Sequence, residues 1–254
     1  MQPFGAIPKP ANVLRRRVRR VVYTCLFGYS ERFNDFSYAD AEDIDFICFT
    51  DDAQLSSSFW QMRLVPSGLL DPARQAKRFK TSPHRFLPDY DWSLYIDNIV
   101  RLKASPRQIF DQYLAGATSP YVCFRHHARD CVYAEAEEVI RLKFDDPARV
   151  QAQMDLYRRL GYPAHNGLAK GAFILRRHVD PILQPVMERW FEQILCHSKR
   201  DQLSLNPVMW KFRFEPSYLP LKFFDFDLLD WPIVKGARLP RDSMMAATCA
   251  LIRT

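Results

Sequence analysis

Acidic residues stand directly after two predicted strands of the chain. Asp51 and Asp52 follow the apolar run 45–50, and Asp97 ends the run 92–97, which we expect to be a buried central strand. In an open α/β sheet, ligands bind beyond the carboxyl ends of the strands, so these carboxylates are placed to meet a ligand or its metal ion. On spacing alone, an ordinary turn aspartate is the favoured interpretation of Asp97, because Asp and Asn suit turns.

Basic residues on a predicted helix complement these acids. The run 72–87 favours a helix that Pro83 ends or kinks. Positive charge stands on neighbouring turns of this helix, at Arg74, at Lys77 or Arg78, and at Lys80. Acids that bind a metal ion, together with cations that face phosphates, are the groups that a nucleoside diphosphate needs. His84 could also reach a phosphate, although packing explains this residue equally well.

A further group of polar side chains follows the predicted strand 121–124. His126 and His127 could contact a metal or an acceptor, but a hydrogen-bonded or surface histidine is the favoured interpretation of each. Arg125 and Arg129 could bind an anionic acceptor, or they could form salt bridges with neighbouring acids. We therefore retain these four side chains as candidate acceptor contacts.

Asp201 opens a predicted helix over 201–212, at a position where Asp is a preferred N-cap. The same carboxylate could act as the base that takes the proton of an acceptor hydroxyl, or it could hold the hydroxyl groups of a sugar. The capping role and the chemical role are equally supported by the sequence, and they are compatible with one another.

Predicted strands alternate with predicted helices along most of the chain. This order indicates an α/β domain with a mixed sheet and helices on both faces. No G-x-G-x-x-G run follows the first strand and no G-x-x-x-x-G-K-[ST] run occurs, which excludes the dinucleotide and P-loop fingerprints. The predicted strands cover 21–27, 45–50, 60–65, 92–97, 121–124 and 172–175, and the predicted helices cover 72–87, 106–116, 132–142, 147–160, 180–196 and 201–212.

The charge of the chain is unevenly distributed. The 254 residues carry a net charge of +7, which favours anionic partners. Five arginines in the run 15–20 account for most of this charge. We favour a solvated lead-in to the first strand, and a contact with a membrane surface or with nucleic acid is the alternative. Because the rest of the chain is nearly balanced, we expect no nucleic-acid partner.

The cysteines and the hydropathy bear on the location of the protein. The six cysteines form no C-x-x-C pair, and Cys25, Cys48 and Cys123 fall within predicted strands, as small buried side chains do in a reducing compartment. No apolar run is long enough to span a bilayer, and the first ten residues do not resemble a signal peptide. We expect a cytoplasmic protein, with a peripheral position on the inner face of a membrane as the alternative.

Five stretches of the chain match a known family in the same order. With them, the chain resembles a glycosyltransferase-like family that was first catalogued as a domain of unknown function. Its plant members are linked to cell-wall polysaccharide, and its bacterial members lie near surface-glycan genes. The matching stretches are YTCLFGYSERFND at 23–35, DFICFTDD at 45–52, AKRFKTSPHRFLPDYDWSLYIDNIVRL at 76–102, RHHARDCVYAEAE at 125–137 and SKRDQLSLN at 198–206.

The resemblance implies a single GT-A domain that moves a sugar from a nucleotide-diphosphate sugar to a glycan or other hydroxyl acceptor, in bacteria as part of surface polysaccharide synthesis. It also implies roles for individual residues, assigned by their position in the family pattern. It places Tyr23, Thr24, Phe27, Gly28 and Tyr29 around the nucleotide base, Asp51 near the base or ribose, Lys77, Lys80 and His84 toward the phosphates, Asp97 in the metal-binding motif, and Asp201 and Gln202 at the donor sugar or reaction centre.

The metal-binding motif of that family is incomplete in this chain. Asn98 and Ile99 follow Asp97, so the second carboxylate of the Asp-x-Asp pattern is absent. Mn²⁺ or Mg²⁺ could still bind through Asp97, the diphosphate and water, since Mg²⁺ sites often use few protein carboxylates. Alternatively, Lys77 and Lys80 supply the charge that neutralises the leaving diphosphate.

We expect three regions in the chain. They are a basic arm over 1–20, a GT-A-like domain over 21–215, and an irregular segment over 216–254 that packs on the domain. Two other functions remain open. One is a basic protein that binds a membrane surface or nucleic acid without catalysis, and the other is a sugar nucleotidyltransferase. The absence of a glycine-rich loop after the first strand counts against the nucleotidyltransferase.

Overall fold

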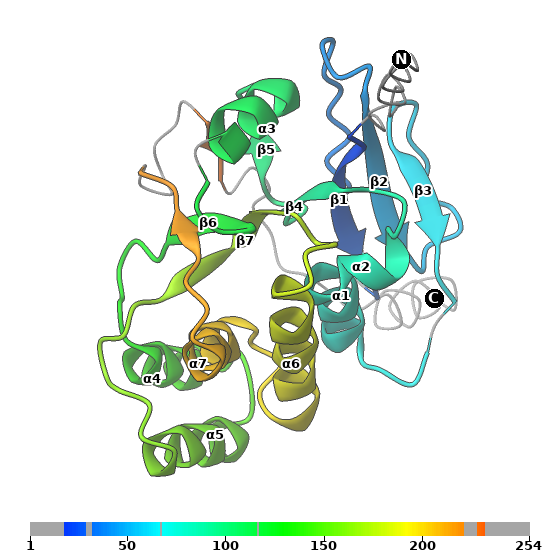
Figure 1. The fold of residues 1–254 in the computed structure, drawn as a ribbon. Helices are drawn as coiled ribbons and strands as arrows, with labels where there is room; N and C mark the ends of the chain where they lie inside the picture. Colours follow the sequence, from blue (N-terminus) through cyan, green and yellow to red (C-terminus); the bar gives the residue numbers. More distant parts are fainter. Residues whose placement is uncertain (1–17, 29–31, 67, 116, 221–227, 232–254) are drawn as a thin grey trace, which may run out of the picture.

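A computed structural model describes residues 18–28, 32–66, 68–115, 117–220 and 228–231 of the chain (Figure 1). The strands are β1 (Arg20–Leu26), β2 (Ile44–Thr50), β3 (Gln61–Leu64), β4 (Trp92–Ile96), β5 (Arg101–Leu102), β6 (Tyr121–Arg125), β7 (Ala169–Arg176), β8 (Ser217–Tyr218) and β9 (Leu229–Asp230). The helices are α1 (Pro72–Thr81), α2 (Pro83–Phe86), α3 (Pro106–Ala115), α4 (Val132–Arg141), α5 (Pro147–Arg159), α6 (Leu183–Cys196) and α7 (Gln202–Phe212).

One sheet of seven strands organises the domain, in the order β3-β2-β1-β4-β7-β6-β8. Strands β1 to β4 run parallel, whereas β7 is antiparallel to both of its neighbours, β4 and β6. Strand β6 therefore points in the same direction as β4. As a result, the carboxyl ends of β1, β2, β4 and β6 share one edge of the sheet, which is where α/β folds bind ligands.

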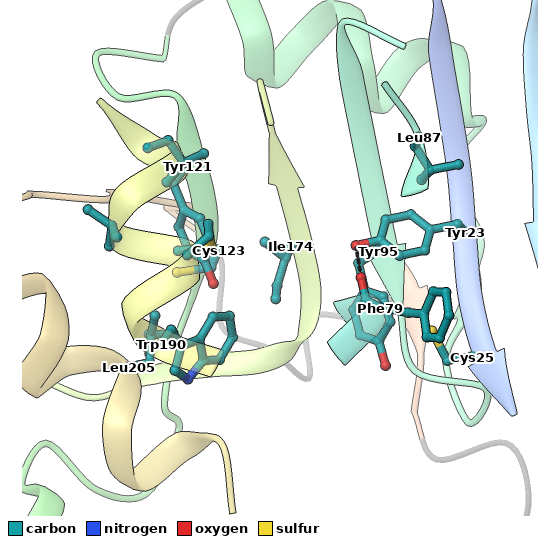
Figure 2. Close-up of a cluster of buried hydrophobic side chains, with 14 of the residues drawn as sticks. Tyr23, Cys25, Phe79, Leu87, Tyr95, Tyr121, Cys123, Ile174, Trp190 and Leu205 are labelled. Atoms are coloured by element: carbon teal, nitrogen blue, oxygen red, sulfur yellow. Dashed lines mark hydrogen bonds between the residues drawn. The ribbon is translucent and has the colours of Figure 1, made fainter. Parts of the chain in front are cut away.

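Two apolar cores cover the two faces of this sheet. On one face, side chains of β1 and β4 pack against α1, and those of β6 and β7 pack against α6 and α7. Figure 2 shows this core, with Tyr23, Tyr95 and Phe79 on one side of Ile174 and Trp190 on the other. Helix α3 and the segments around β2 and β5 fill the core on the opposite face. The expected mixed α/β sheet with helices on both faces is confirmed.

The helix that carries the basic residues begins and ends for identifiable reasons. The side chain of Asp71 accepts a hydrogen bond from the Arg74 amide at 3.1 Å, and Pro72 occupies the first helical position, where its missing N–H costs nothing. At the other end, Pro83 cannot continue the hydrogen-bond ladder, and Ser82 separates α1 from α2. The break expected at this proline is confirmed.

Some elements differ from the prediction. Strand β7 is longer than 172–175, because Ala169 and Lys170 continue to pair with β6 after a register shift between Cys123 and Phe124. The short strands β8 and β9 were not predicted. Strand β8 adds to the sheet beside β6, and β9 pairs with β5. Parts of the segment expected to be irregular therefore form regular pairs with the domain.

The expectations about charge and cysteines concern the first strands. Of the basic run 15–20, residues 15–17 lie outside the described part, while Arg20 pairs with Asp111 at 2.7 Å. Cys25 and Cys48 are buried free thiols, and so is Cys123. Among the residues that the structure describes, no helix combines the length and the apolar character needed to cross a bilayer.

Candidate active site

A buried cluster of charges joins α1 to the start of α7. Asp201 accepts from two lysines of α1, with Lys80 Nζ at 2.6 Å from Oδ2 and Lys77 Nζ at 3.0 Å from Oδ1. The two lysines reach the same carboxylate because residues three apart share one face of a helix. Asp201 occupies the N-cap position of α7, but its side chain makes no capping hydrogen bond. The carboxylate therefore pairs with the two lysines and does not cap the helix.

Asp97 lies beside this cluster at the carboxyl end of β4. Its Oδ1 accepts a hydrogen bond from the Tyr95 hydroxyl at 2.8 Å and lies 3.8 Å from Lys80 Nζ. Gly171 on β7 leaves the space that the cluster occupies. A Cβ at this position would lie 2.8 Å from Lys80 Nζ and 3.1 Å from Asp201 Oδ2. A side chain at residue 171 would thus displace the ion pair.

The pKa values show how the charges of the cluster depend on one another. Burial alone would raise the pKa of Asp201, but the ammonium groups of Lys77 and Lys80 hold it well below its usual range. Burial acts the same way on Asp97, and the same two lysines again lower the pKa below its ordinary value. Asp201 is therefore a weak base in this arrangement, which favours its role as a counter-ion over that of a proton acceptor.

The pKa values of the two lysines shift in opposite directions. Burial would lower the pKa of Lys80, but Asp201 and Asp97 raise it above the usual value. For Lys77 the effect of burial prevails over the attraction of Asp201, and its pKa is lowered. The side chain of Lys80 is 2% exposed, whereas that of Lys77 is 20% exposed. Lys80 is thus a structural partner of the two acids, and Lys77 is the cation that a ligand can reach.

A pocket of about 320 Å³ opens next to the cluster, at the carboxyl edge of the sheet. Three cations line it together with Asp97, and the rest of its wall is mostly apolar. The lining residues are Cys25, Leu26, Phe27, Pro72, Ala73, Ala76, Lys77, Tyr95, Asp97, Asn98, Phe144, Lys199 and Arg200. Several cations around a small pocket with apolar walls suit a ligand that combines phosphates with a ring.

The sequence analysis did not identify two of these cations. Lys199 and Arg200 stand on the loop before α7, which Asp145 fixes by accepting from the Lys199 amide at 2.8 Å and from the Ser198 hydroxyl at 2.7 Å. The guanidinium of Arg200 lies over the ring of Phe144 at 4.7 Å from its centroid, which is a cation–π contact. Their position directly before Asp201 in the matched stretch 198–206 was the signal that could have found them.

The turn after β1 brings the backbone close to α1. Gly28 has φ +66°, and a Cβ there would lie 2.3 Å from Pro72 Cγ, so both the conformation and the space require glycine. Its amide donates to both carboxylate oxygens of Asp51, at 3.0 and 3.1 Å. Phe27, the residue before it, lines the pocket and stacks on Phe79 at 5.3 Å. Asp51 therefore fixes the turn that forms one wall.

Six described residues that were predicted at the nucleotide do not line this pocket: Tyr23, Thr24, Gly28, Asp51, Lys80 and His84. Tyr23 is fully buried in the core (Figure 2). Its hydroxyl donates to the Lys80 carbonyl at 3.1 Å. Thr24 points to the opposite face of β1, because successive residues of a strand alternate between faces. His84 contacts Glu188 on α6 at 2.5 Å. The structure thus places Tyr23, Thr24 and His84 outside the lining of this pocket, and Tyr29 lies outside the described residues.

The residues around Asp97 do not form a protein cage for a metal ion. In the described part of the chain, no group of three or more His, Cys, Asp or Glu side chains is close enough to hold one. The amide of Asn98 is already used, since it accepts from the Asn34 amide at 3.1 Å and donates to the Arg32 carbonyl at 3.0 Å. Asp97 would be the single carboxylate ligand of a divalent ion, with the diphosphate and water supplying the others.

The side chains after β6 form a separate group. Arg129 donates to Glu135 at 2.5 Å, which is the salt bridge considered as the alternative to acceptor binding. His126 Nδ1 accepts from the Arg129 amide at 3.0 Å. Burial, Lys170 and other neighbouring cations lower the pKa of His126 to about 3, so this imidazole is neutral at physiological pH. His127 stacks on His126, with 4.7 Å between the ring centroids.

Gln202 and Arg125 are two further residues predicted at the site. The Gln202 side-chain nitrogen, at the first position of α7, is buried and has no hydrogen-bond partner among the described residues. Arg125, at the end of β6, lies over the ring of Tyr218 at 3.9 Å and lines a second and larger pocket. Gln202 is thus placed beside the reaction centre proposed from the sequence, and Arg125 is placed at a neighbouring site.

Comparison with known proteins identifies the family of the chain. Residues 12–228 match the TOD1/MUCI70 glycosyltransferase-like domain. Over 180 residues the chain is 29% identical to the probable hexosyltransferase MUCI70 of Arabidopsis thaliana, covering 68% of this chain and 31% of that protein, so the match spans about a third of the relative. Mouse xyloside xylosyltransferase 1 in its apo form aligns with a TM-score of 0.44 and 9% identity, over 80% of this chain and 84% of the mouse chain.

The fold and the family profile define the class of the protein, a glycosyltransferase-like α/β domain. Within that class, the chain belongs to the TOD1/MUCI70 glycosyltransferase-like family. The resemblance found in the sequence is therefore confirmed, and the expectation of a glycosyltransferase is confirmed at the level of the family.

Proposed function

We propose that this chain transfers a sugar from a nucleotide-diphosphate sugar to a glycan hydroxyl, with the donor bound in the pocket beside Asp97. The observation that carries the proposal is the convergence of Lys77, Lys199 and Arg200 on one pocket at the carboxyl edge of the sheet. Two phosphates need such a set of cations, and the apolar wall around Phe27 suits the ring of a base.

In the proposed reaction, the bond between the anomeric carbon and the diphosphate oxygen breaks, and the acceptor oxygen forms a new bond to that carbon. The acceptor hydroxyl gives up its proton to a base. Negative charge grows on the diphosphate as it leaves, and cations already in place stabilise that charge without having to reorganise. Lys77, Lys199 and Arg200 would do this, while Asp201 and Lys80 would hold Lys77 in position.

A divalent ion is compatible with this proposal. If Mn²⁺ or Mg²⁺ binds, Asp97 would hold it and the ion would add positive charge at the diphosphate. Lysine and arginine would supply the larger share of the positive charge at the diphosphate. The support is that the pocket contains three cations and a single carboxylate. Gln202, whose side-chain nitrogen has no partner among the described residues, would donate a hydrogen bond to the donor sugar.

The setting that we propose is cytoplasmic synthesis of a bacterial surface polysaccharide, with peripheral membrane contact through the run 15–20. The support is the resemblance of the five sequence stretches to a family whose bacterial members lie near surface-glycan genes, together with the five arginines of that run. Pelleting with vesicles that contain anionic lipid tests the membrane contact. A protein that stays in the supernatant at low salt would contradict it.

Nucleotide binding is tested by thermal shift with a panel of nucleoside diphosphates and nucleotide sugars, each with and without Mn²⁺. A nucleotide at a hundredfold excess over its Kd stabilises the fold by about 2.7 kcal/mol. This corresponds to a rise in Tm of about 5–10 °C for a chain of this size. A shift that grows with Mn²⁺ supports a metal at Asp97, and an equal shift without it supports the cations. No shift with any nucleotide would contradict the proposal.

Substitution of Lys77 tests which group binds the phosphates. We expect Lys77→Met to weaken nucleotide binding by about ten- to a hundredfold, since hydrogen bonds to charged groups contribute about 1.5–3 kcal/mol. The fold should persist, because the pair of Lys80 and Asp201 remains. Lys103→Met, at an exposed lysine that lies outside the pocket, is the matched control and should bind as the unmodified protein does. Equal affinity for both variants would refute the role of Lys77.

A further inference from the structure

The second pocket lies on the same edge of the sheet as the donor pocket. It has a volume of about 730 Å³, which is within the usual range for ligand sites. Side chains from the end of β6, the loop before β7, helix α7 and strand β8 form its wall. The lining residues are Arg125, His165, Asn166, Gly167, Asn206, Met209, Trp210, Lys211, Arg213, Phe214, Glu215, Pro216 and Tyr218.

Its position relative to the donor pocket follows from the topology. Asp97 comes directly after β4 and Arg125 ends β6, and these strands point the same way with only β7 between them. Two strand spacings separate them, which is about 10 Å. Helix α7 makes the same connection. Asp201 precedes its first residue and belongs to the charge cluster, and Asn206, five residues later, lines the second pocket, a rise of about 7.5 Å along the axis. The two pockets are therefore neighbours.

The charge of the second pocket is unbalanced. Arg125, Lys211 and Arg213 contribute three cations to the wall, and Glu215 is the single carboxylate in it. Within the described part of the chain, none of these three cations forms an ion pair with an acid, in contrast to Arg129, which Glu135 neutralises at 2.5 Å. Cations that line a concave site without partner acids favour an anionic ligand.

The aromatic residues of the wall suit a saccharide. Tyr218 supports the guanidinium of Arg125 from below, at 3.9 Å, and so holds this cation at the rim. Trp210 is 40% exposed although its ring packs edge-on against Tyr162 at 5.5 Å. A rigid indole that is fixed on one side and open on the other offers a flat apolar surface to the face of a sugar ring, next to polar groups that bind its substituents.

We propose that this pocket binds the acceptor and that the acceptor is an acidic saccharide, whose anionic substituent pairs with Arg125 and Arg213. The proposal rests on the proposed function, since it assigns the acceptor of the same transfer. An anionic group pairs with arginine in a planar, two-point geometry, which both a carboxylate and a phosphate can adopt. The end of the saccharide that carries the attacking hydroxyl would extend toward the donor pocket.

Binding of three matched trisaccharides tests this assignment by titration calorimetry on the full chain. The probes are cellotriose, the same trisaccharide oxidised at its primary alcohols to glucuronates, and cellotriose 6-phosphate. We expect at least one anionic probe to bind at least about tenfold more tightly than cellotriose, and the tighter of the two identifies the anionic group. Equal affinity for the three probes, or no binding of any, would overturn the proposal.

Charge-removing variants locate the binding. Arg125→Gln and Arg213→Gln should each reduce the affinity for the anionic probe about tenfold and leave that for cellotriose unchanged. Arg159→Gln, at an exposed arginine on α5 that lies outside the pocket, is the matched control and should have no effect. All three positions are exposed, so the variants should fold. If the two pocket variants bind as the control does, the pocket is not the site.

The nucleotide thermal shift separates this proposal from the donor site. Arg125→Gln and Arg213→Gln should retain the full shift with the nucleotide, because neither residue lines the donor pocket. If the unmodified chain binds the anionic saccharide but no nucleotide, the proposed transfer fails and the saccharide site stands. If it binds the nucleotide and discriminates among no trisaccharides, the acceptor assignment alone fails.

Discussion

The pair of Asp201 and Lys80 allows a quantitative test of the site. Replacing Asp201 with Asn keeps the size and shape of the side chain but removes its charge. The variant leaves the Lys80 ammonium, whose side chain is 2% exposed, with Asp97 at 3.8 Å as the remaining acid. It also leaves Lys77 next to Lys80 without the carboxylate that separates their charges. We therefore expect a large loss of stability.

The size of the loss follows from the burial of the pair. Removing one partner of a buried ion pair costs about 3–5 kcal/mol, because the other charge remains buried and uncompensated. For a chain of this length, each kcal/mol lowers Tm by about 2–4 °C, so Asp201→Asn should lower Tm by about 6–20 °C. Urea denaturation at neutral pH measures the free energy directly. A loss below about 1 kcal/mol would refute the argument, since it is the value typical of a solvent-exposed pair.

A second substitution tests whether the uncompensated charge is the cause. In the double variant Asp201→Asn/Lys80→Met, the buried ammonium is gone and an apolar chain of similar length replaces it. We expect the double variant to recover most of the lost stability, as replacement of whole buried ion pairs commonly does. If the stability losses of the two substitutions instead add, the loss of stability in Asp201→Asn arises from something other than the charge of Lys80.

The same pair predicts how stability depends on pH. The pKa of Asp201 is lower in the folded chain than in the unfolded chain, where it is about 3.9. The ion pair therefore contributes its full stability above that value. Below about pH 4 the unfolded chain takes up the proton first, and the contribution falls by about 1.4 kcal/mol per pH unit. The difference in unfolding free energy between the unmodified chain and Asp201→Asn should be constant near neutral pH and shrink below about pH 4.

Two further substitutions test how the scaffold positions the site. Gly28→Ala should cost about 1–3 kcal/mol in urea denaturation and weaken nucleotide binding, because a Cβ would strain a φ of +66° and overlap Pro72 at the start of α1. Gly68→Ala, with no atom within 4 Å of the added Cβ, is the control and should change stability by less than about 0.5 kcal/mol. Arg176→Met should cost about 1–3 kcal/mol, since the fully buried guanidinium donates to the carbonyl of Lys80 at the end of α1. A stability equal to that of the unmodified chain would contradict either argument.

The sequence was sufficient to predict the elements that end at the site. Strand β4 is a compact apolar run that stops at Asp97, and local composition alone marks both its type and its end. The positive charge on neighbouring turns of α1 was predicted for the same reason, and the resemblance then singled out Lys77 and Lys80. Where a feature depends on neighbours along the chain, the prediction was therefore reliable.

Features that depend on contacts between distant segments were not predictable in this way. Tyr23 and Cys25 lie on the same face of β1, so its sequence could not show that Cys25, nearer the carboxyl end, lines the pocket while Tyr23 fills the core. Nor could the sequence show that β7 inserts antiparallel between β4 and β6 and places Gly171 against Lys80. The counter-ion role of Asp201 required the same knowledge, because the helix-cap position is occupied but the cap itself is not formed.

Two tryptophans lie next to the two pockets, and their fluorescence can report ligand binding. The indole N–H of Trp190 donates to the Asp201 carbonyl at 2.9 Å, and this side chain is fully buried, whereas Trp210 is 40% exposed in the wall of the second pocket. A soluble quencher such as acrylamide therefore reaches Trp210 and spares Trp190. With the other three tryptophans, Trp60, Trp92 and Trp231, replaced by phenylalanine, ligands at the two pockets can be followed separately in one unlabelled sample, by quencher protection at Trp210 and by an emission change at Trp190.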